Sequence, residues 1–373
     1  MKHIGKNVGV RLLVAGGAFI GVLLLVAGLV FSRHPAAKAT AAGSTGLTSI
    51  AVAPAVRPLS QEVAPIDKYL DSHRDRYRLA VKRAKTWVDS LTIDPLDLRL
   101  HKVKGKKKLA ECLDFYIRLY DIAPAREKQA LMDAIKKRVA ITSESRYHDL
   151  ASLSDIHFKQ DATSYLRVAF LMDRVGLDTL FYQDEIKKIL PRFNAHMVTR
   201  GTDQRMAFHL YYQHFGLAEP FPLASAFQAG IIAARRAPSE INDRMSVYSL
   251  THEIFVPYQF GDKLDARFFS DDDKTYLRPV LSTLTREYIK LNDPDVVSEL
   301  SSCLSYLQFT DLPVYQTALT YLLDCQQADG KWGNYEAYRP FYGEYVNQGY
   351  YLHTTLVALD ALTTAFQLLR PPQ

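Results

Sequence analysis

The chain has 373 residues, of which 48% are hydrophobic and 23% charged, and its formal net charge is +6. This composition excludes a largely disordered protein and provides material for one large domain or two small ones. The positive charge is partly concentrated between Lys102 and Lys108, and it is too modest to predict nucleic-acid binding. That run would suit anionic lipid headgroups or an acidic glycan, but we favour a solvated loop that leads into a helix.

The N-terminus predicts a membrane anchor. Residues 1–11 are basic, and residues 12–31 are a run of about twenty uncharged residues, which as a helix would cross a bilayer core of ~30 Å. Cleavable signal peptides have a shorter apolar core, so we favour an uncleaved signal anchor, although Ala37-Lys38-Ala39 would suit cleavage. Charge on residues 1–11 places them in the cytoplasm, which predicts a single-pass inner-membrane protein whose C-terminal domain is extracytoplasmic, or periplasmic.

The remainder of the chain predicts a linker followed by an all-α domain. Residues 32–64 are rich in Ala, Ser, Thr, Gly and Pro and form a flexible linker. Residues 65–370 show helical periodicity and almost no sustained alternation, so an α-solenoid or irregular helical bundle is one possible architecture. The predicted helices, in chain order, are 66–91, 109–120, 125–139, 163–175, 184–193, 205–215, 222–234, 245–256, 275–291, 296–307, 315–327 and 352–366.

Single residues within these helices are interpreted as structural. Cys112, Cys303 and Cys325 lie inside helical patterns without a Cys-x-x-Cys motif, so we expect buried small side chains rather than a disulfide framework. Residues 222–234 are small and apolar enough to predict an inner, tightly packed helix. Ser270 and the three aspartates after it are interpreted as the N-cap and first turn of the next helix.

The C-terminal residues resemble a known repeat. Gln326 or Gln327, Asp329-Gly330, Trp332 and Tyr351 to Thr354 are similar to one repeat of the α/α-toroid superfamily, over about fifty residues. That superfamily includes terpene cyclases and protein prenyltransferase β-subunits. The resemblance implies that the Gln and Gly-x-Trp element is a structural clasp, and it implies fold more than chemistry. Twelve helices as six hairpins would suit an α/α toroid, and we expect an uncharacterised, bacterial, membrane-anchored member.

The sequence completes neither a general zinc motif nor the metal and acid motifs of these two families. His252-Glu253 lacks the second histidine of a zinc motif because position 256 is Val. His353 resembles a prenyltransferase zinc ligand, but Asp324 and Cys325 are adjacent instead of two residues apart. Asp271 to Asp273 satisfies neither acid motif of the terpene cyclases. We therefore predict no metal site and no cofactor.

Two stretches contain the candidate functional residues. In the first, His252 at a helix end is a candidate proton donor with Glu253 or Asp262 as its partner, and a structural histidine is the alternative. This stretch resembles one in an uncharacterised bacterial family, which supplies no activity. In the second, residues 334–348, aromatic rings and charges suit either a carbohydrate or a protein surface. The catalytic candidates are His252, Glu253, Glu336 and Glu344, and the ligand-binding candidates are Tyr248, Tyr258, Asp262, Trp332, Tyr335, Arg339, Tyr342, Tyr351 and His353.

We hold two hypotheses of function. The first is a non-enzymatic domain that binds a partner or ligand, a glycan or a protein, in an envelope assembly. The second is an enzyme that acts on envelope glycan or peptide through a His/Glu site in the toroid funnel. Convergence of His252, His353 and the carboxylates of residues 334–348 in one cavity would favour the enzyme. Substrate, zinc content, signal cleavage and oligomeric state cannot be predicted from these residues.

Overall fold

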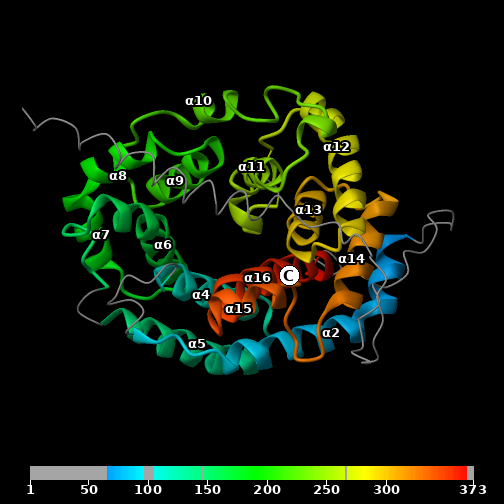
Figure 1. Ribbon diagram of the computed structural model, residues 1–373, viewed down its shortest axis with the longest axis horizontal. Coiled ribbons are helices and arrows are strands. Elements are labelled where there is room, and N and C mark those ends of the chain that lie inside the picture. Colours follow the sequence, from blue (N-terminus) through cyan, green and yellow to red (C-terminus); the bar gives the residue numbers. More distant parts are fainter. Residues whose placement is uncertain (1–64, 96–104, 144–146, 265–266, 368–373) are drawn as a thin grey trace, which may run out of the picture. The chain divides into compact units, whose positions relative to one another are not determined.

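The computed structural model describes residues 65–95, 105–143, 147–264 and 267–367, and over these ranges the chain is all-α, with 14 α-helices and no strand (Figure 1). The predicted all-α class is therefore confirmed. Within the described ranges, residues 65–242 and 246–367 belong to one compact unit and residues 243–245 to another. The helices are α2 (Ile66–Ser90), α4 (Gly105–Ile122), α5 (Ala125–Val139), α6 (Asp155–Arg174), α7 (Leu180–Lys188), α8 (Leu190–Met197), α9 (Thr202–His214), α10 (Leu223–Gln228), α11 (Arg244–Phe255), α12 (Asp271–Lys290), α13 (Pro294–Tyr306), α14 (Pro313–Cys325), α15 (Arg339–Tyr342) and α16 (Leu352–Gln367).

The predicted N-terminal segments lie outside the described residues. They are the basic segment 1–11, the membrane helix 12–31 and the linker 32–64. Among the helices that the structure does describe, none combines the length and the apolar composition that crossing a membrane requires.

Local sequence sets several helix boundaries. The Ser270 hydroxyl accepts a hydrogen bond from the Asp273 N–H at 3.1 Å, and the Asp273 carboxylate accepts one from the Ser270 N–H at 2.9 Å. This capping box confirms the predicted N-cap of α12. The Asp293 side chain caps α13, and Pro294 follows it as the first helical residue, where a missing N–H costs nothing.

The predicted inner helix over residues 222–234 is wrong. Helix α10 is only six residues long, because the Glu253 carboxylate accepts hydrogen bonds from the N–H groups of Ile231 and Ile232 at 2.8 and 3.0 Å. A Cβ at Gly230 would lie 2.6 Å from that carboxylate, so only glycine allows the approach. Glu253 of α11 thus binds the two backbone N–H groups that would otherwise donate within a longer helix.

The predicted solvated loop at the lysine run is also wrong in part. Helix α4 already begins at Gly105, and Lys106 and Lys108 are buried. Lys106 pairs with Asp149 and Asp161 at 3.2 and 3.1 Å, since a buried ammonium group requires acidic partners. Cys112 and Cys303 are buried free thiols, as predicted, whereas Cys325 is half-buried.

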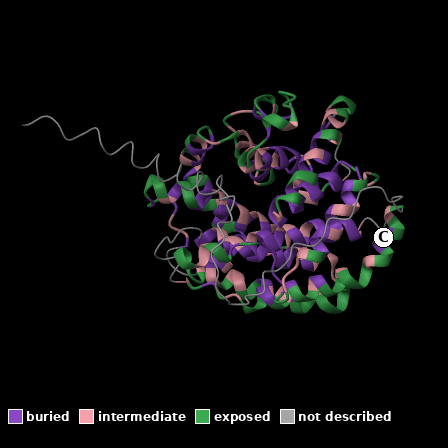
Figure 2. Ribbon diagram, turned by 45° about the vertical axis from the view of Figure 1, so that its right-hand side comes forward, coloured by how far each residue is buried: buried purple, intermediate pink, exposed green. Residues whose placement is uncertain are grey.

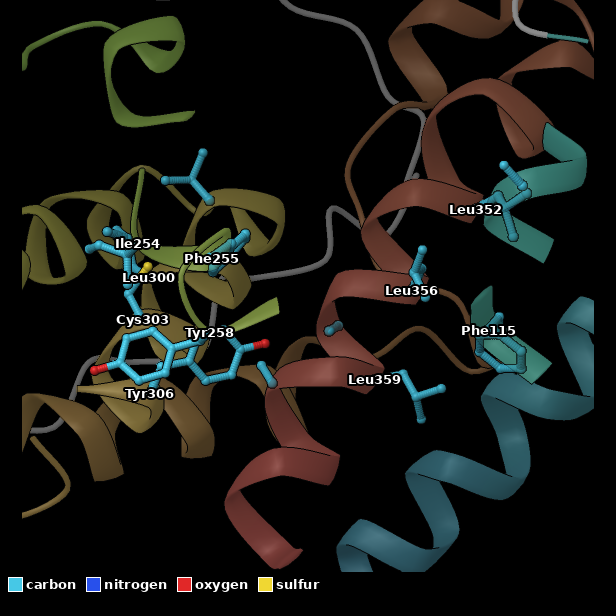
Figure 3. Close-up of a cluster of buried hydrophobic side chains, with 14 of the residues drawn as sticks. Phe115, Ile254, Phe255, Tyr258, Leu300, Cys303, Tyr306, Leu352, Leu356 and Leu359 are labelled. Atoms are coloured by element: carbon cyan, nitrogen blue, oxygen red, sulfur yellow. The ribbon is translucent and has the colours of Figure 1, made fainter. Parts of the chain in front are cut away.

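The core is centred on α13 and α16, which pack against each other, and α16 also packs on α4 and α2. Every residue of α13 is buried, whereas α5 buries only two of its residues (Figure 2). Apolar and aromatic side chains of α4, α11, α13 and α16 contribute to this core (Figure 3). Burying each large apolar side chain contributes roughly 1.5–3 kcal/mol. The labelled core residues are Phe115, Ile254, Phe255, Tyr258, Leu300, Cys303, Tyr306, Leu352, Leu356 and Leu359.

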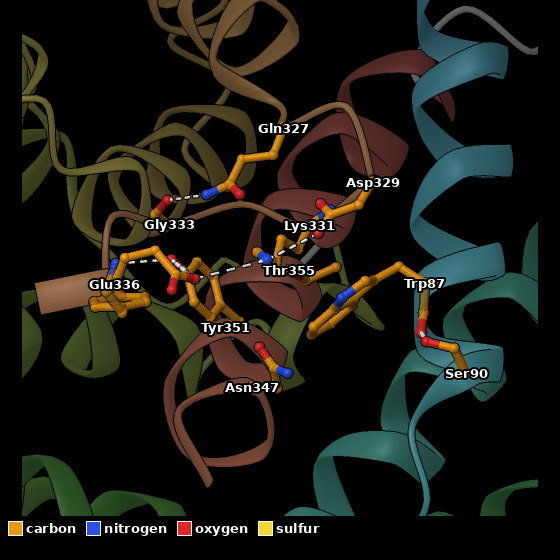
Figure 4. Close-up of polar contacts among 12 residues, drawn as sticks. Trp87, Ser90, Gln327, Asp329, Lys331, Gly333, Glu336, Asn347, Tyr351 and Thr355 are labelled. Carbon is orange, nitrogen blue, oxygen red and sulfur yellow. Dashed lines mark hydrogen bonds and ion pairs between the residues drawn. The ribbon is translucent and has the colours of Figure 1, made fainter. Parts of the chain in front are cut away.

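A C-terminal corner, residues 326–355, fixes α14 against α2 and α16. The Gln326 amide donates to the Ala80 carbonyl of α2 at 2.9 Å. The Trp332 indole is completely buried and donates to the Leu322 carbonyl at 2.7 Å, and its backbone N–H donates to Thr355 of α16 at 3.1 Å. Figure 4 shows the corner's other polar contacts, including Gln327 with Gly333 and Tyr351 with Glu336.

Candidate functional site

A cavity of about 320 Å³ lies among five helices of the larger unit. Helices α4, α6, α9, α11 and α16 line it together with residues 259–262, so its residues come from segments far apart in the sequence. Both charged and aromatic side chains line its wall. The lining side chains are Lys107, Asp114, Arg118, Lys159, Gln160, Thr163, Ser164, Arg167, Phe170, Leu171, Arg174, Arg200, Asp203, Gln204, Ala207, Leu210, Tyr211, His252, Gln259, Phe260, Asp262 and His353.

His353, on the first turn of α16, lies at the cavity wall with a quarter of its side chain exposed. Its Nδ1 is 2.9 Å from Oε1 of Glu111, a buried carboxylate of α4. Burial raises the pKa of Glu111, but the charges of Lys107 and His353 outweigh burial and bring the pKa to about 2. Glu111 is therefore ionised at neutral pH, and it orients the imidazole ring.

Two further buried carboxylates lie on the other side of His353. Asp295 Oδ1 and Glu299 Oε1, both from α13, are each 3.8 Å from His353 Nε2. Hydroxyl groups donate to both carboxylates, which reduces the cost of their burial. Thr354 donates to Asp295 at 2.8 Å, and Thr251 donates to Glu299 at 2.5 Å.

His252 enters the cavity from α11, beside the same carboxylates. Its Nδ1 lies 2.8 Å from the Tyr248 carbonyl and 3.9 Å from Glu299 Oε2. Burial lowers the pKa of His252, although Asp203, from α9, opposes this effect. The neutral imidazole is thus favoured, with a nitrogen that can accept a proton. We call Glu111, His252, Asp295, Glu299 and His353 the acid–histidine cluster.

A second cavity of about 500 Å³ shares Arg118, Arg174 and Asp262 with this one. We call these residues, together with Arg167, Asp114 and Asp360, the partition. Arg167 pairs with Asp114, and Arg118 lies 3.6, 3.2 and 3.2 Å from Asp114, Asp262 and Asp360. Arg174 is 2.8 Å from Asp262 as well. Burial raises the pKa of Asp262 to about 6 despite these cations. The partition is therefore a fixed network of opposite charges.

The structure brings three of the predicted site residues together and places another elsewhere. His252, His353 and Asp262 line the cavity. Glu253 is buried against the backbone of residues 231 and 232 and does not line it. The proposed pairing of His252 with Glu253 or Asp262 is replaced by its proximity to Glu299.

The other predicted residues belong to the core or to the C-terminal corner. The Tyr248 hydroxyl donates to Asp295, and Tyr258 is buried against Phe269 and Tyr306. Trp332, Tyr335 and Tyr351 are buried in the corner, and Tyr342 packs on Tyr350. Arg339 contacts Glu336 at 2.6 Å and Glu344 at 3.0 Å. The carboxylates of residues 334–348 therefore pair with Arg339 and do not enter the cavity, so the convergence expected for an enzyme is met only by His252 and His353.

Sequence reasoning missed most of the residues that form the site. Glu111, Asp295 and Glu299 were not candidates, nor were Lys159, Arg200 and Asp203. The sequence did contain an indication of these carboxylates. Glu111 and Glu299 each lie among apolar and small residues, in helices of which most or all residues are buried. An unpartnered carboxylate there would be costly, so each such residue predicts a polar partner from another helix. Among the described residues, no group of three or more His, Cys, Asp or Glu side chains has an arrangement suited to a metal ion.

Comparison with known proteins supplies a family and no activity. Searches of curated proteins and of solved structures found no match. A family model described as "Domain of unknown function (DUF6895)" matches residues 141–363, which include α6 to α14 and most of α16. Since this match covers more than half of the sequence, the chain belongs to the DUF6895 family.

Proposed function

We propose that the chain is a membrane-anchored enzyme of the cell envelope that acts on a glycan by acid–base chemistry in the cavity. The observation that carries this proposal is His353, which is held by the ionised Glu111 at 2.9 Å and lines the cavity, with Asp295 and Glu299 each 3.8 Å from its Nε2. A carboxylate that accepts from Nδ1 favours the tautomer with a free Nε2, as it does in other acid–base histidines.

His353 and His252 divide the chemistry between them. In a substrate complex, Nε2 of His353 takes a proton from a water molecule as the water oxygen bonds to the anomeric carbon of the sugar. The glycosidic C–O bond breaks, and the His353 imidazolium, stabilised until then by Glu111, Asp295 and Glu299, returns the proton to the departing sugar oxygen. His252 and Asp203 reach the same cavity from α11 and α9, so a second group is available to give or hold a proton. Phe170, Tyr211 and Phe260 offer ring faces on which a sugar can stack. Paired acid and base groups typically contribute about 10²–10⁴-fold to rate.

We further propose that the domain is an α/α toroid. In support, α4, α6, α9, α11 and α16 line one cavity, and each is separated from the next along the chain by one or more helices that do not line it. The last cavity-lining helix, α16, packs on the first, α4, which a closed ring requires. Residues 12–31 supply the anchor, and the C-terminal domain is then extracytoplasmic.

One observation favours the alternative of a non-enzymatic binding domain. Phe341 is 81% exposed and Tyr342 45% exposed, and both lie on the short helix α15 whose Arg339 is fixed by Glu336 and Glu344. Exposed aromatic residues on a rigid support are typical of contacts with a partner protein. This surface would recruit an envelope partner whether or not the cavity is catalytic.

The test uses the full chain in detergent micelles, incubated with glycan fragments released from bacterial envelopes. We expect new reducing ends or changed masses, measured by liquid chromatography and mass spectrometry. His353→Asn should reduce the rate by at least about 100-fold, whereas Lys188→Gln, an exposed residue of α7, should leave it unchanged. Fragments that bind without any change in mass would overturn the enzyme and leave the binding domain.

A further inference from the structure

Most of the positive charge in the cavity is neutralised by acidic neighbours. Arg118, Arg167 and Arg174 form ion pairs in the partition, and Lys107 lies 3.2 Å from Glu111. These cations are held in place by carboxylates, so a ligand would have to compete with strong existing pairs. We therefore assign these four cations to stabilising the cavity wall and not to binding a substrate.

Arg200 is different, because every acceptor it contacts is neutral. Its Nε lies 2.9 Å from His196 Nε2, its Nη1 lies 3.0 Å from the Gln204 side-chain oxygen, and its Nη2 donates to the Lys159 carbonyl. Asp203 raises the pKa of Arg200 through space but forms no ion pair with it in the described structure, and burial lowers that pKa overall. The guanidinium is therefore fixed in position by neutral groups and forms no direct ion pair with a carboxylate of the described residues.

His196 cannot supply the missing negative charge. It is buried, and burial together with Arg200 and Lys159 lowers its pKa to about 4. At neutral pH it is an uncharged ring that accepts from Arg200 and orients the guanidinium group. Its function in this arrangement is to position Arg200.

Lys159 adds a second positive charge at the same wall. Its side chain is exposed and lines the cavity, and its backbone carbonyl holds Arg200. The two cations thus belong to adjoining segments, α6 and the residue before the α9 N-cap. A planar guanidinium beside a flexible ammonium is well suited to a carboxylate or phosphate group.

We propose that Arg200 and Lys159 form an anion-binding subsite, so that the substrate of the cavity is an acidic sugar with a carboxylate or phosphate group. This inference rests on the proposed function. The anionic group binds at Arg200 and Lys159, and the sugar ring extends into the cavity toward His252 and His353. A neutral sugar would leave the two positive charges without a partner.

The test measures calorimetric binding of glucose, glucuronate and glucose 6-phosphate to the full chain in detergent micelles. These three probes share one ring and differ in charge at carbon 6. We expect the better acidic probe to bind at least about tenfold more tightly than glucose, and Arg200→Gln and Lys159→Gln each to remove about ten- to a hundredfold of that affinity. Lys188→Gln, which removes the same charge from an exposed position outside the cavity, should have no effect.

The outcomes separate the subsite from the enzyme. Preference for glucuronate or for glucose 6-phosphate identifies the anion as carboxylate or phosphate. Equal affinity for all three probes, or acidic-probe binding that survives Lys159→Gln in a folded variant, overturns the subsite even if glycan turnover is found. If the chain binds the acidic probes selectively but turns over no glycan, and His353→Asn binds those probes as tightly as the wild type, the subsite is supported and the enzyme is contradicted.

Discussion

The cavity and the C-terminal corner are both rich in charged and aromatic residues, but their charges are used differently. In the corner, Arg339 is saturated by Glu336 and Glu344, and the Trp332 and Tyr351 rings are buried. In the cavity, Arg200 has only neutral acceptors, and His353 connects a buried carboxylate to open space.

This difference shows why local density of polar residues is a weak guide to function. The corner's residues are close in sequence, so they meet one another and complete their own hydrogen bonds. Most of the cavity's residues come from five helices, and several of them, including His353, Arg167 and Arg174, pair with residues of another helix. Changes in the corner should therefore reduce stability, and changes in the cavity should reduce binding or turnover.

The largest expected effect is on stability and comes from the corner. Trp332→Ala removes a completely buried ring and the hydrogen bond to the Leu322 carbonyl. We expect the free energy of unfolding to fall by about 4 kcal/mol, as for other buried aromatic residues. Urea denaturation followed by circular dichroism measures this. Phe341→Ala, at an exposed position of the same region, should change it by less than about 0.5 kcal/mol, and equal losses would contradict the structural role of Trp332.

The next effect concerns Glu253, which the sequence suggested as catalytic. Glu253→Gln replaces an oxygen that accepts from the Ile231 or Ile232 N–H with an amide donor. Because one buried N–H then lacks an acceptor, we expect a loss of about 2 kcal/mol in the free energy of unfolding. Affinity for the acidic sugar probe should stay within about twofold of the wild type. If Glu253→Gln is as stable as the wild type but has lost glycan turnover, Glu253 has a catalytic role and our structural assignment is wrong.

His196 predicts a pH dependence of stability. Its pKa is about 4 in the folded protein, against 6.5 ordinarily, so the unfolded chain binds its proton first as the pH falls. The folded state should therefore lose stability progressively between pH 6.5 and 4, by about 2 kcal/mol after allowance for solvent screening. Urea midpoints at pH 7 and pH 4.5 measure this loss. His196→Gln, which keeps an acceptor for Arg200, should lose less; an identical loss would exclude His196 as its source.

The sequence predicted the all-α class and several long helices, but it did not predict the site. Long segments such as α2, α5, α12 and α13 were predicted nearly in full, because the signals that mark them are local: helical periodicity in α2 and α5, and the N-caps Ser270 and Asp293 before α12 and α13. The end of α10 could not be predicted, since Glu253 captures its N–H groups from a separate helix. For the same reason, His252 and His353 were found as single candidates, while their partners Glu111 and Glu299 depend on packing between helices.

The smallest expected effect comes from the exposed ion pairs of the C-terminal corner, and it tests whether the corner takes part in binding or turnover. Glu336→Gln with Glu344→Gln removes both carboxylates from Arg339, in a loop where their side chains are 56% and 83% exposed. Arg339, Lys331 and Tyr351 hold the pKa of Glu336 at about 2, chiefly through the hydrogen bond from Arg339. Exposed pairs contribute little because water and salt screen them, so we expect a loss below about 1 kcal/mol at pH 7. Glycan turnover and acidic-probe affinity should remain at wild-type levels, since neither carboxylate lines the cavity. Loss of turnover in this variant, with stability intact, would place the active site in the corner and remove the cavity as its location.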